Sequence, residues 1–296
     1  MAISSDIKPQ EIEAYCEGEE LVPSRWESAF EWRNDDTDSI KLGTWGLDGL
    51  NRLPTWADGA SDLPTGRVKD NGSKTVTYTQ VGISIGIRKM DARHVPNIVS
   101  KTLRMVGRAI ANTRALTGAA IVNGAHSTTT VVPGGKTLAA TDHPTVAGTR
   151  SNKISTGLDL GAIFAAMTLA RQWKDYDDGD FDLAEGGWDL MYPIVAGLEQ
   201  TVGQALGSQY TSDQLQVNTS GMFGISAFPW AKITTPTHWA LQSKVVRTLG
   251  MWVPEDAADN LEVYVDPNNR QTKIICDGAY AAFCEANPSG FIGGAT

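Results

Sequence analysis

Residues 134–137 resemble the end of a phosphate-binding loop motif. The segment reads Gly134-Gly135-Lys136-Thr137, but Thr130 stands where the first glycine of that motif is required, and a helical pattern precedes it instead of a strand. Without that glycine the backbone amides cannot wrap around a phosphate group. The sequence therefore predicts a loop here and no nucleotide site.

The acidic run 175–182 offers hard oxygen ligands of the kind that calcium prefers. Its glycine, Gly179, falls at the fifth place of the run where a calcium loop has it at the sixth, and no glutamate occupies the twelfth. We interpret the run as a solvated turn between a helix and a strand, and we expect no metal site.

The remaining reactive side chains form no recognisable catalytic set. The four histidines lack an HExxH spacing and no GxSxG elbow is present, so His143, which precedes Pro144, is interpreted as structural. Cys16, Cys276 and Cys284 are an odd number without a CxxC pair and are expected to be buried free thiols. The sequence predicts no catalytic residue, no cofactor and no enzyme activity.

Charge is distributed unevenly along the chain. Residues 1–65 hold 14 acids and 5 bases, whereas residues 66–114 hold 10 bases and only two acids, Asp70 and Asp91. The pI is near 5.0, and Tyr78 is the one aromatic residue in the basic stretch, which disfavours a dedicated nucleic-acid-binding segment. Attraction between the acidic segment of one subunit and the basic segment of another would account for both charged segments.

Two neighbouring elements must position these charges. Apolar residues alternate from Val81 to Ile87, which predicts a half-buried strand, and residues 95–123 then predict one helix with Pro96 in its first turn. At 1.5 Å per residue this helix would be roughly 40 Å long. A helical wheel puts charged residues opposite an apolar stripe formed by Val99, Leu103, Val106, Ile110, Thr117 and Ile121.

The rest of the chain predicts a mixture of short helices and strands. We expect an arm over 1–65, a hairpin over 66–91 with its tip at 70–73, a loop over 126–135 and a final hairpin over 261–276. Further predicted elements are helices at 159–173 and 194–206 and strands at 188–192, 230–233 and 239–242. Without regular βαβ alternation, the predicted class is α+β.

The order of these elements resembles the major capsid (head) protein of tailed bacteriophages, particularly the Mu-like major head subunit group. The segments that carry the resemblance are Thr141–Pro144, Gly148–Asn152, Met167 with Gln172, Asp177–Gly179, Leu190–Pro193, Leu198–Glu199, Ala205–Ser208, Asp277–Tyr280 and Asn287–Phe291. Each motif is short, and the resemblance rests on their order and spacing over most of residues 66–296.

The resemblance implies a Johnson-type capsid fold in four parts. These are an N-terminal arm (1–65), an extended hairpin loop (66–94), a peripheral domain built on a spine helix (95–125 and 259–285) and an axial domain (126–258 and 286–296). A separate scaffolding protein is expected, because no long charged helical prefix precedes the arm. No lysine–asparagine pair for the crosslinking known in some members is identifiable.

The implied function is self-assembly into an icosahedral shell around double-stranded DNA held without sequence specificity. Expected partners are other copies in hexamers and pentamers, the scaffold, a portal and cement proteins; no membrane partner is expected, since the chain lacks a transmembrane span. The expected location is the virion, after assembly in the host bacterial cytoplasm. Alternatives are an encapsulin-type nanocompartment shell around a cargo enzyme, and a soluble enzyme of unknown chemistry.

Aromatic and basic side chains are the candidates for contact between subunits, although the tryptophans could equally fill the chain's own core. The candidates are Trp26, Trp32, Trp45, Trp56, Arg67, Lys69, Lys74, Arg88, Lys101, Arg104 and Arg108.

Overall fold

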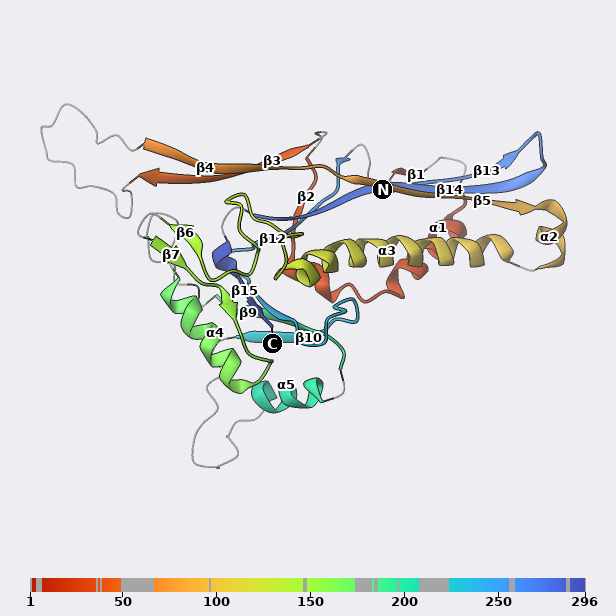
Figure 1. The fold of residues 1–296 in the computed structure, drawn as a ribbon. Coiled ribbons are helices and arrows are strands. Elements are labelled where there is room, and N and C mark those ends of the chain that lie inside the picture. Colours follow the sequence, from red (N-terminus) through yellow and green to blue (C-terminus); the bar gives the residue numbers. More distant parts are fainter. Residues whose placement is uncertain are drawn as a thin grey trace, which may run out of the picture.

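A long helix backed by a sheet, a second body of strands and helices, and a projecting hairpin make up the chain (Figure 1). The computed structural model describes residues 2–3, 7–35, 37, 39–48, 67–95, 97–145, 148–173, 183, 186–195, 197–207, 224–255, 259–285 and 288–295. The acidic run 175–182 and Trp56 lie outside these residues.

Helices and strands are both present throughout, which confirms the predicted α+β class. The helices are α1 (Pro9–Glu20), α2 (Lys89–His94), α3 (Ile98–Gly124), α4 (Leu160–Gln172) and α5 (Leu198–Gly207), with short 3₁₀ helices η1 (Arg25–Ala29) and η4 (Pro288–Gly290). The strands are β1 (Ala2–Ile3), β2 (Glu31–Arg33), β3 (Ile40–Asp48), β4 (Arg67–Val76), β5 (Thr79–Arg88), β6 (His143–Thr145), β7 (Gly148–Arg150), β8 (Lys153–Ile154), β9 (Trp188–Tyr192), β10 (Ile225–Pro229), β11 (Trp239–Ser243), β12 (Leu249–Trp252), β13 (Asn260–Asp266), β14 (Gln271–Cys284) and β15 (Phe291–Gly294).

The first sheet has the order β1-β13-β14-β12-β2, with β5 also paired to β14. The predicted final hairpin is confirmed as β13 and β14, and β14 continues as far as Cys284. Helix α3 lies along this sheet and buries the predicted apolar face, including Leu103, Val106 and Ile110. It begins at Ile98, three residues later than predicted, because Asn97 has a left-handed backbone (φ 58°) that no α-helix continues through.

The second sheet has the order β10-β9-β11-β15-β8 and is covered by α4 and α5. Strands β9 and β11 and helix α4 confirm the predictions, and the Asp159 carboxylate caps α4 by accepting a hydrogen bond from the Ala162 amide. The strand predicted at 230–233 is wrong: β10 ends at Pro229, and the Ile233 amide donates to the Trp230 carbonyl in a turn.

The hairpin predicted within 66–91 is also wrong. Strand β4 pairs with β3, from earlier in the chain, while β5 pairs with β14. The predicted tip at 70–73 lies inside β4, where the register shifts between Gly43 and Trp45 of the partner strand. Two residues of β4 oppose one of β3 there, so the turn-forming pair Asn71-Gly72 makes a β-bulge.

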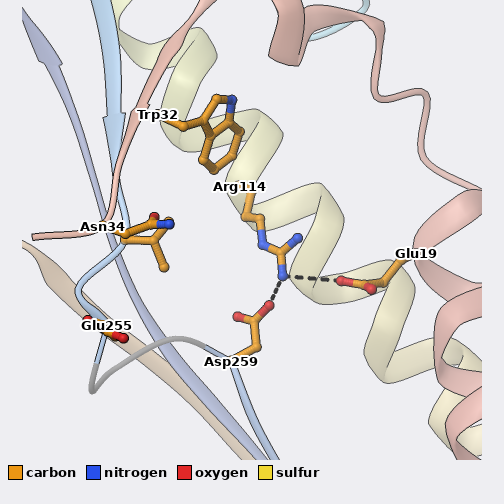
Figure 2. A pocket seen from close by; sticks show the side chains of 7 residues that line it. Glu19, Trp32, Asn34, Arg114, Glu255 and Asp259 are labelled. Carbon is orange, nitrogen blue, oxygen red and sulfur yellow. Dashed lines mark ion pairs between the residues drawn. The ribbon is translucent and has the colours of Figure 1, made fainter. Parts of the chain in front are cut away.

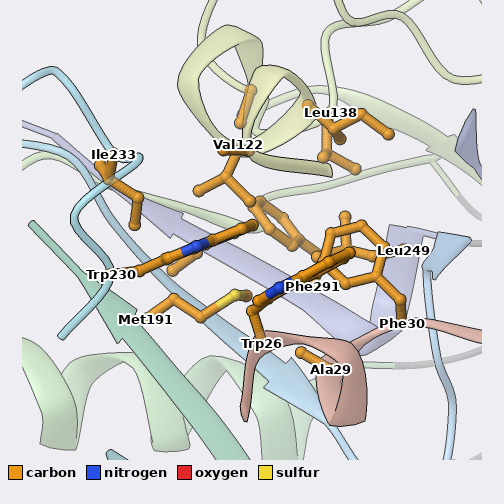
Figure 3. Close-up of a cluster of buried hydrophobic side chains, with 14 of the residues drawn as sticks. Trp26, Ala29, Phe30, Val122, Leu138, Met191, Trp230, Ile233, Leu249 and Phe291 are labelled. Atoms are coloured by element: carbon orange, nitrogen blue, oxygen red, sulfur yellow. The ribbon is translucent and has the colours of Figure 1, made fainter. Parts of the chain in front are cut away.

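One core joins the two bodies. It contains Val122 from the end of α3, Met191 and Phe291 from the second sheet, and Trp26 and Phe30 from the segment after α1 (Figure 3). Because a close-packed core transmits strain, the spine helix and the second sheet are mechanically coupled.

Candidate assembly surface

Helix α1 packs against the spine helix α3 at a crossing made of glycines. A Cβ built on Gly18 would lie 2.1 Å from the Arg104 carbonyl oxygen, and one on Gly107 would lie 2.2 Å from the Tyr15 carbonyl oxygen. Both obstacles are backbone atoms, so only residues without a side chain allow this approach. The crossing fixes the first part of the predicted arm onto the chain's own helix.

Ion pairs reinforce that contact within the chain. Arg104 pairs with Glu17, and Arg114 pairs with Glu19 at 3.2 Å and with Asp259. The expectation that the acidic segment meets the basic helix across a subunit boundary is therefore wrong for these carboxylates of α1. Helix α3 of the same chain supplies the ion-pair partners of Glu17 and Glu19, which the charge distribution along the sequence could not reveal.

The four tryptophans of the predicted arm have different environments. Trp26 is 3% exposed and stacks on Trp230 with ring centroids 5.6 Å apart, so its assignment as a contact between subunits is wrong: it fills the chain's own core (Figure 3). Trp32 is 38% exposed and stays a candidate. Trp45 lies in the part of β3, residues 44–48, of which the structure describes the backbone only, and Trp56 is outside the described residues.

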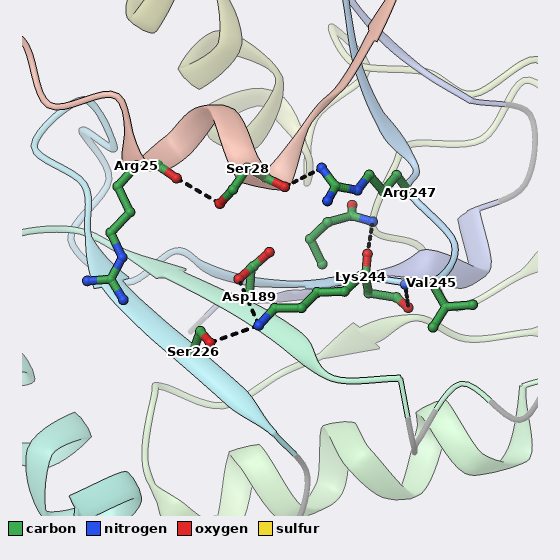
Figure 4. Close-up of polar contacts among 9 residues, drawn as sticks. Arg25, Ser28, Asp189, Ser226, Lys244, Val245 and Arg247 are labelled. Carbon is green, nitrogen blue, oxygen red and sulfur yellow. Dashed lines mark hydrogen bonds and ion pairs between the residues drawn. The ribbon is translucent and has the colours of Figure 1, made fainter.

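Backbone anchoring also fixes the segment that carries Trp26. The Arg247 guanidinium donates to the carbonyl oxygens of Ser28 and Phe30, the latter at 3.0 Å (Figure 4). Nearby, Lys244 donates to the Ser226 hydroxyl at 2.8 Å and lies 3.6 Å from the buried Asp189 carboxylate. Residues 25–30 are thus fixed to the chain's own core and are not available to extend onto a neighbouring copy.

The predicted basic contacts fall into three groups. Arg88, Lys101 and Arg108 are exposed and make no ion pair with a described residue, so they remain candidates. Arg104 is exposed but paired, and Lys74 donates to the Val131 carbonyl at 2.7 Å. Arg67 and Lys69 lie in the first part of β4, residues 67–72, of which the structure describes the backbone only.

Arg114 lines two adjoining cavities, and Figure 2 shows the larger of them. The larger, of about 600 Å³, is lined by Trp32, Asn34, Glu255 and Asp259; the smaller, of about 400 Å³, lies against Trp26 and Glu27. Both also contact Glu19. The sequence shows Arg114 only as one of ten basic residues in 66–114. Its position beside the two cavities becomes evident from its ion pairs with Glu19 and Asp259, which come from distant segments of the chain.

The described residues show no arrangement typical of catalysis. No group of histidine, cysteine and acidic side chains among them could hold a metal ion. His143 is buried, and its Nε2 atom lies 3.0 Å from Oδ1 of Asn152, in keeping with the structural role expected for it. Cys276 and Cys284 are buried free thiols as predicted, whereas Cys16 is exposed because it lies on the outer face of α1. Of the described helices, none is both long and apolar enough to cross a bilayer.

Two histidines lie together where α3 meets the second sheet. The rings of His126 and His238 are 4.7 Å apart, and the Nδ1 atom of each is buried without a hydrogen-bond partner. Burial, the neighbouring His238 and the Lys153 ammonium lower the pKa of His126 to about 4, and burial also lowers the pKa of His238. Both rings are therefore neutral in the folded chain at pH 7.

We expect this pair to make the fold acid-sensitive. A histidine with a lowered pKa binds its proton more readily in the unfolded chain, so stability is complete above about pH 6.5 and falls as the pH drops toward 4. Melting temperatures of wild type and His126→Gln/His238→Gln between pH 7 and 4.5 test this. The variant should lose less stability on acidification, whereas His94→Gln, at an exposed histidine, should follow wild type; equal losses in all three proteins would contradict the prediction.

Comparison with known proteins gives the fold. No protein-family model and no curated protein matches the chain. Its structure is similar to the mature capsid of bacteriophage PhiM1 (11% identity, 93% of this chain and 87% of that chain, TM-score 0.59). It is also similar to the capsid of Ralstonia phage GP4 (10% identity, 93% and 88%, TM-score 0.58) and to that of the cyanophage P-SCSP1u (13% identity, 91% and 87%, TM-score 0.57).

These similarities extend over almost the whole chain at identities that show a shared fold alone. The chain has the α+β fold of bacteriophage capsid subunits, which confirms the fold class predicted from the order of its elements.

Proposed function

We propose that this chain is the structural subunit of an icosahedral shell, the major capsid protein of a tailed bacteriophage, and that it belongs to the Mu-like major head subunit group. Its role is to form interfaces, and no step of it requires catalysis. The capsid fold supports this proposal, and the projecting hairpin of β3 and β4 is the single observation that carries it (Figure 1).

The hairpin is incomplete in a single copy. Its root packs through Ile40, Leu42 and Val76 against Trp252 and Phe283, while its strands run out beyond the body. A two-stranded hairpin is marginally stable alone and requires a surface to pack on. In a shell, a second copy supplies that surface.

Exposed apolar side chains along the molecule agree with an assembled state. The larger ones are Leu21, Ile83, Met90, Met105, Leu116, Ile194, Val245 and Val265. Single exposed apolar residues are ordinary, and their distribution over α2, α3, β5 and β13 is what several separate interfaces would need. Closed symmetry then multiplies modest contacts into a stable particle.

The proposed division of the chain follows the capsid fold, with one change to the predicted boundaries. The peripheral domain is 95–125 with 259–285 and the axial domain is 126–258 with 286–296, as predicted, whereas the arm is shortened from 1–65 to 1–39 because β3 follows it. The extended hairpin is better taken as β3 with β4, because these strands pair with each other. Proposed partners are other copies, a separate scaffolding protein, a portal, cement proteins and packaged double-stranded DNA, in a virion assembled in the bacterial cytoplasm.

Sedimentation and electron microscopy of the purified chain test the proposal. We expect particles of hundreds of subunits, or free hexamers and pentamers, because the hairpin and apolar residues need partners. Nucleic acid that co-purifies with the particles would support a phage head, and a co-purifying enzyme would support a nanocompartment. A monomer at micromolar concentration in every salt and scaffold condition would refute both.

A further inference from the structure

The two cavities beside Arg114 form one acidic trough along α3. We define the acidic trough by the acidic residues that line these cavities, Glu19, Glu20, Glu27, Glu255 and Asp259; Arg114 is the one base in their described lining. Figure 2 shows Arg114 reaching from α3 toward Glu19 on one side and Asp259 on the other; Trp32 and Glu255 line the same cavity. Two of the five carboxylates pair with the guanidinium, and the other three line the cavities beside it.

Arg114 cannot neutralise the trough. It pairs with Glu19 and with one oxygen of Asp259; the Asp259 side chain is 7% exposed, and its other oxygen has no hydrogen-bond partner. Glu20, Glu27 and Glu255 make no ion pair with a described residue, and burial raises the pKa of Glu27. The trough therefore lacks positive charge and attracts a cation.

The chemistry of the trough selects basic side chains over a metal ion. The acids do not converge into a metal-binding group within the described chain, and the Arg114 guanidinium occupies the centre between them. Trp32 adds an exposed aromatic face, which attracts lysine and arginine but contributes nothing to a metal. An occupant with two or three basic side chains fits best.

Uncompensated bases gather at the far end of the same chain. We define the basic corner as Arg88 at the end of β5 with Lys89 and Arg93 on α2. All three are exposed without a described ion pair, Asp91 is the only acid among them, and Met90 beside them is 61% exposed. Lys89 and Arg93 are four residues apart and so share one face of α2.

We propose that the basic corner of one copy docks in the acidic trough of a second copy. The contact cannot form within one chain, because Arg114 lies 16 residues along α3 from Ile98, which places it about 24 Å from the end of the helix that adjoins the corner. Two different surfaces meet, so the contact is head-to-tail, and repeated contacts form a ring where the rotation between copies closes. This inference rests on the proposed shell function and names one of its interfaces.

Charge reversal of each surface, alone and together, tests the docking. Lys89→Glu/Arg93→Glu and Glu20→Lys/Glu255→Lys should each raise the subunit concentration needed for assembly about tenfold or more, since like charges would then face each other in every contact. Because every head-to-tail contact has one corner and one trough, the chain carrying all four changes should assemble near the wild-type concentration. The two double variants change the net charge in opposite directions, so a loss of assembly in both of them cannot be an effect of net charge.

Thermal melting of the unassembled variants separates folding from assembly, and each variant should melt within a few degrees of wild type. If the corner variant assembles like wild type, or if the fourfold variant assembles no better than the two double variants, the docking is refuted while the shell function stands. If the wild-type chain itself forms no assembly in any condition, the proposed function fails instead.

Discussion

Gly107→Ala should lower the free energy of unfolding by about 3 kcal/mol and release α1 from the spine helix. The new methyl group would stand 2.2 Å from the Tyr15 carbonyl oxygen and 3.2 Å from the Glu19 amide nitrogen, both on α1. Backbone atoms cannot rotate away as a flexible side chain can, so the whole helix has to shift. Overpacking of this kind costs about 1–3 kcal/mol or occasionally more, against at most about 1 kcal/mol gained from the better helix propensity of alanine.

Gly203→Ala provides the matched control. Gly203 also lies inside a helix, α5, but nothing lies within 4 Å of the position its Cβ would take. The same substitution should therefore stabilise the chain there by up to about 1 kcal/mol. Urea unfolding of both variants measures the difference, and a Gly107→Ala variant as stable as Gly203→Ala would show that the helices do not need the close approach.

A double-mutant cycle shows whether the crossing acts as a unit. Gly18→Ala alone should destabilise by a similar amount, because its Cβ would meet the Arg104 carbonyl oxygen. Once one glycine has been replaced and the helices have moved apart, the second replacement should cost little, so the two effects should be strongly non-additive. Strict additivity would mean that each glycine acts through a separate contact.

The spine helix and several strands could be predicted because their patterns are local. The apolar stripe of α3 repeats over 27 residues, and β9 and β13 are short apolar or alternating runs. Such periodicity depends only on which face is buried. The order of these elements was then enough to indicate the capsid fold.

The hairpin and the arm could not be predicted because their partners are distant. Asn71-Gly72 is a turn signal, and only the pairing of β4 with β3 shows it to be a bulge. Trp26 is conspicuous in an acidic, irregular segment, yet its stacking partner Trp230 comes some two hundred residues later. Arg114 likewise acquires its role from Glu19 and Asp259, which no spacing connects.

Asn152→Ala should destabilise the second body by about 3–4 kcal/mol. The side chain is completely buried, and its Oδ1 accepts from the Ala140 amide at 2.9 Å and from the His143 Nε2 at 3.0 Å. Its Nδ2 donates to the carbonyl oxygens of Leu138 at 2.8 Å and Phe291 at 3.0 Å. Alanine would leave several buried groups unpaired, each at a cost of about 1–3 kcal/mol, partly recovered by relaxation or by water.

The position of these partners predicts where the damage appears. Asn152 holds the loop after α3 to β15, so amide exchange should accelerate first at Ala140 and along β15, before the sheet beside α3 responds. Ser151→Ala is the control, because its hydroxyl makes only long contacts of 3.3 and 3.4 Å with the Lys153 backbone. It should change the free energy of unfolding by less than about 0.5 kcal/mol. A similar small change for Asn152→Ala, with unaltered exchange at Ala140, would mean that apolar packing alone holds this junction together.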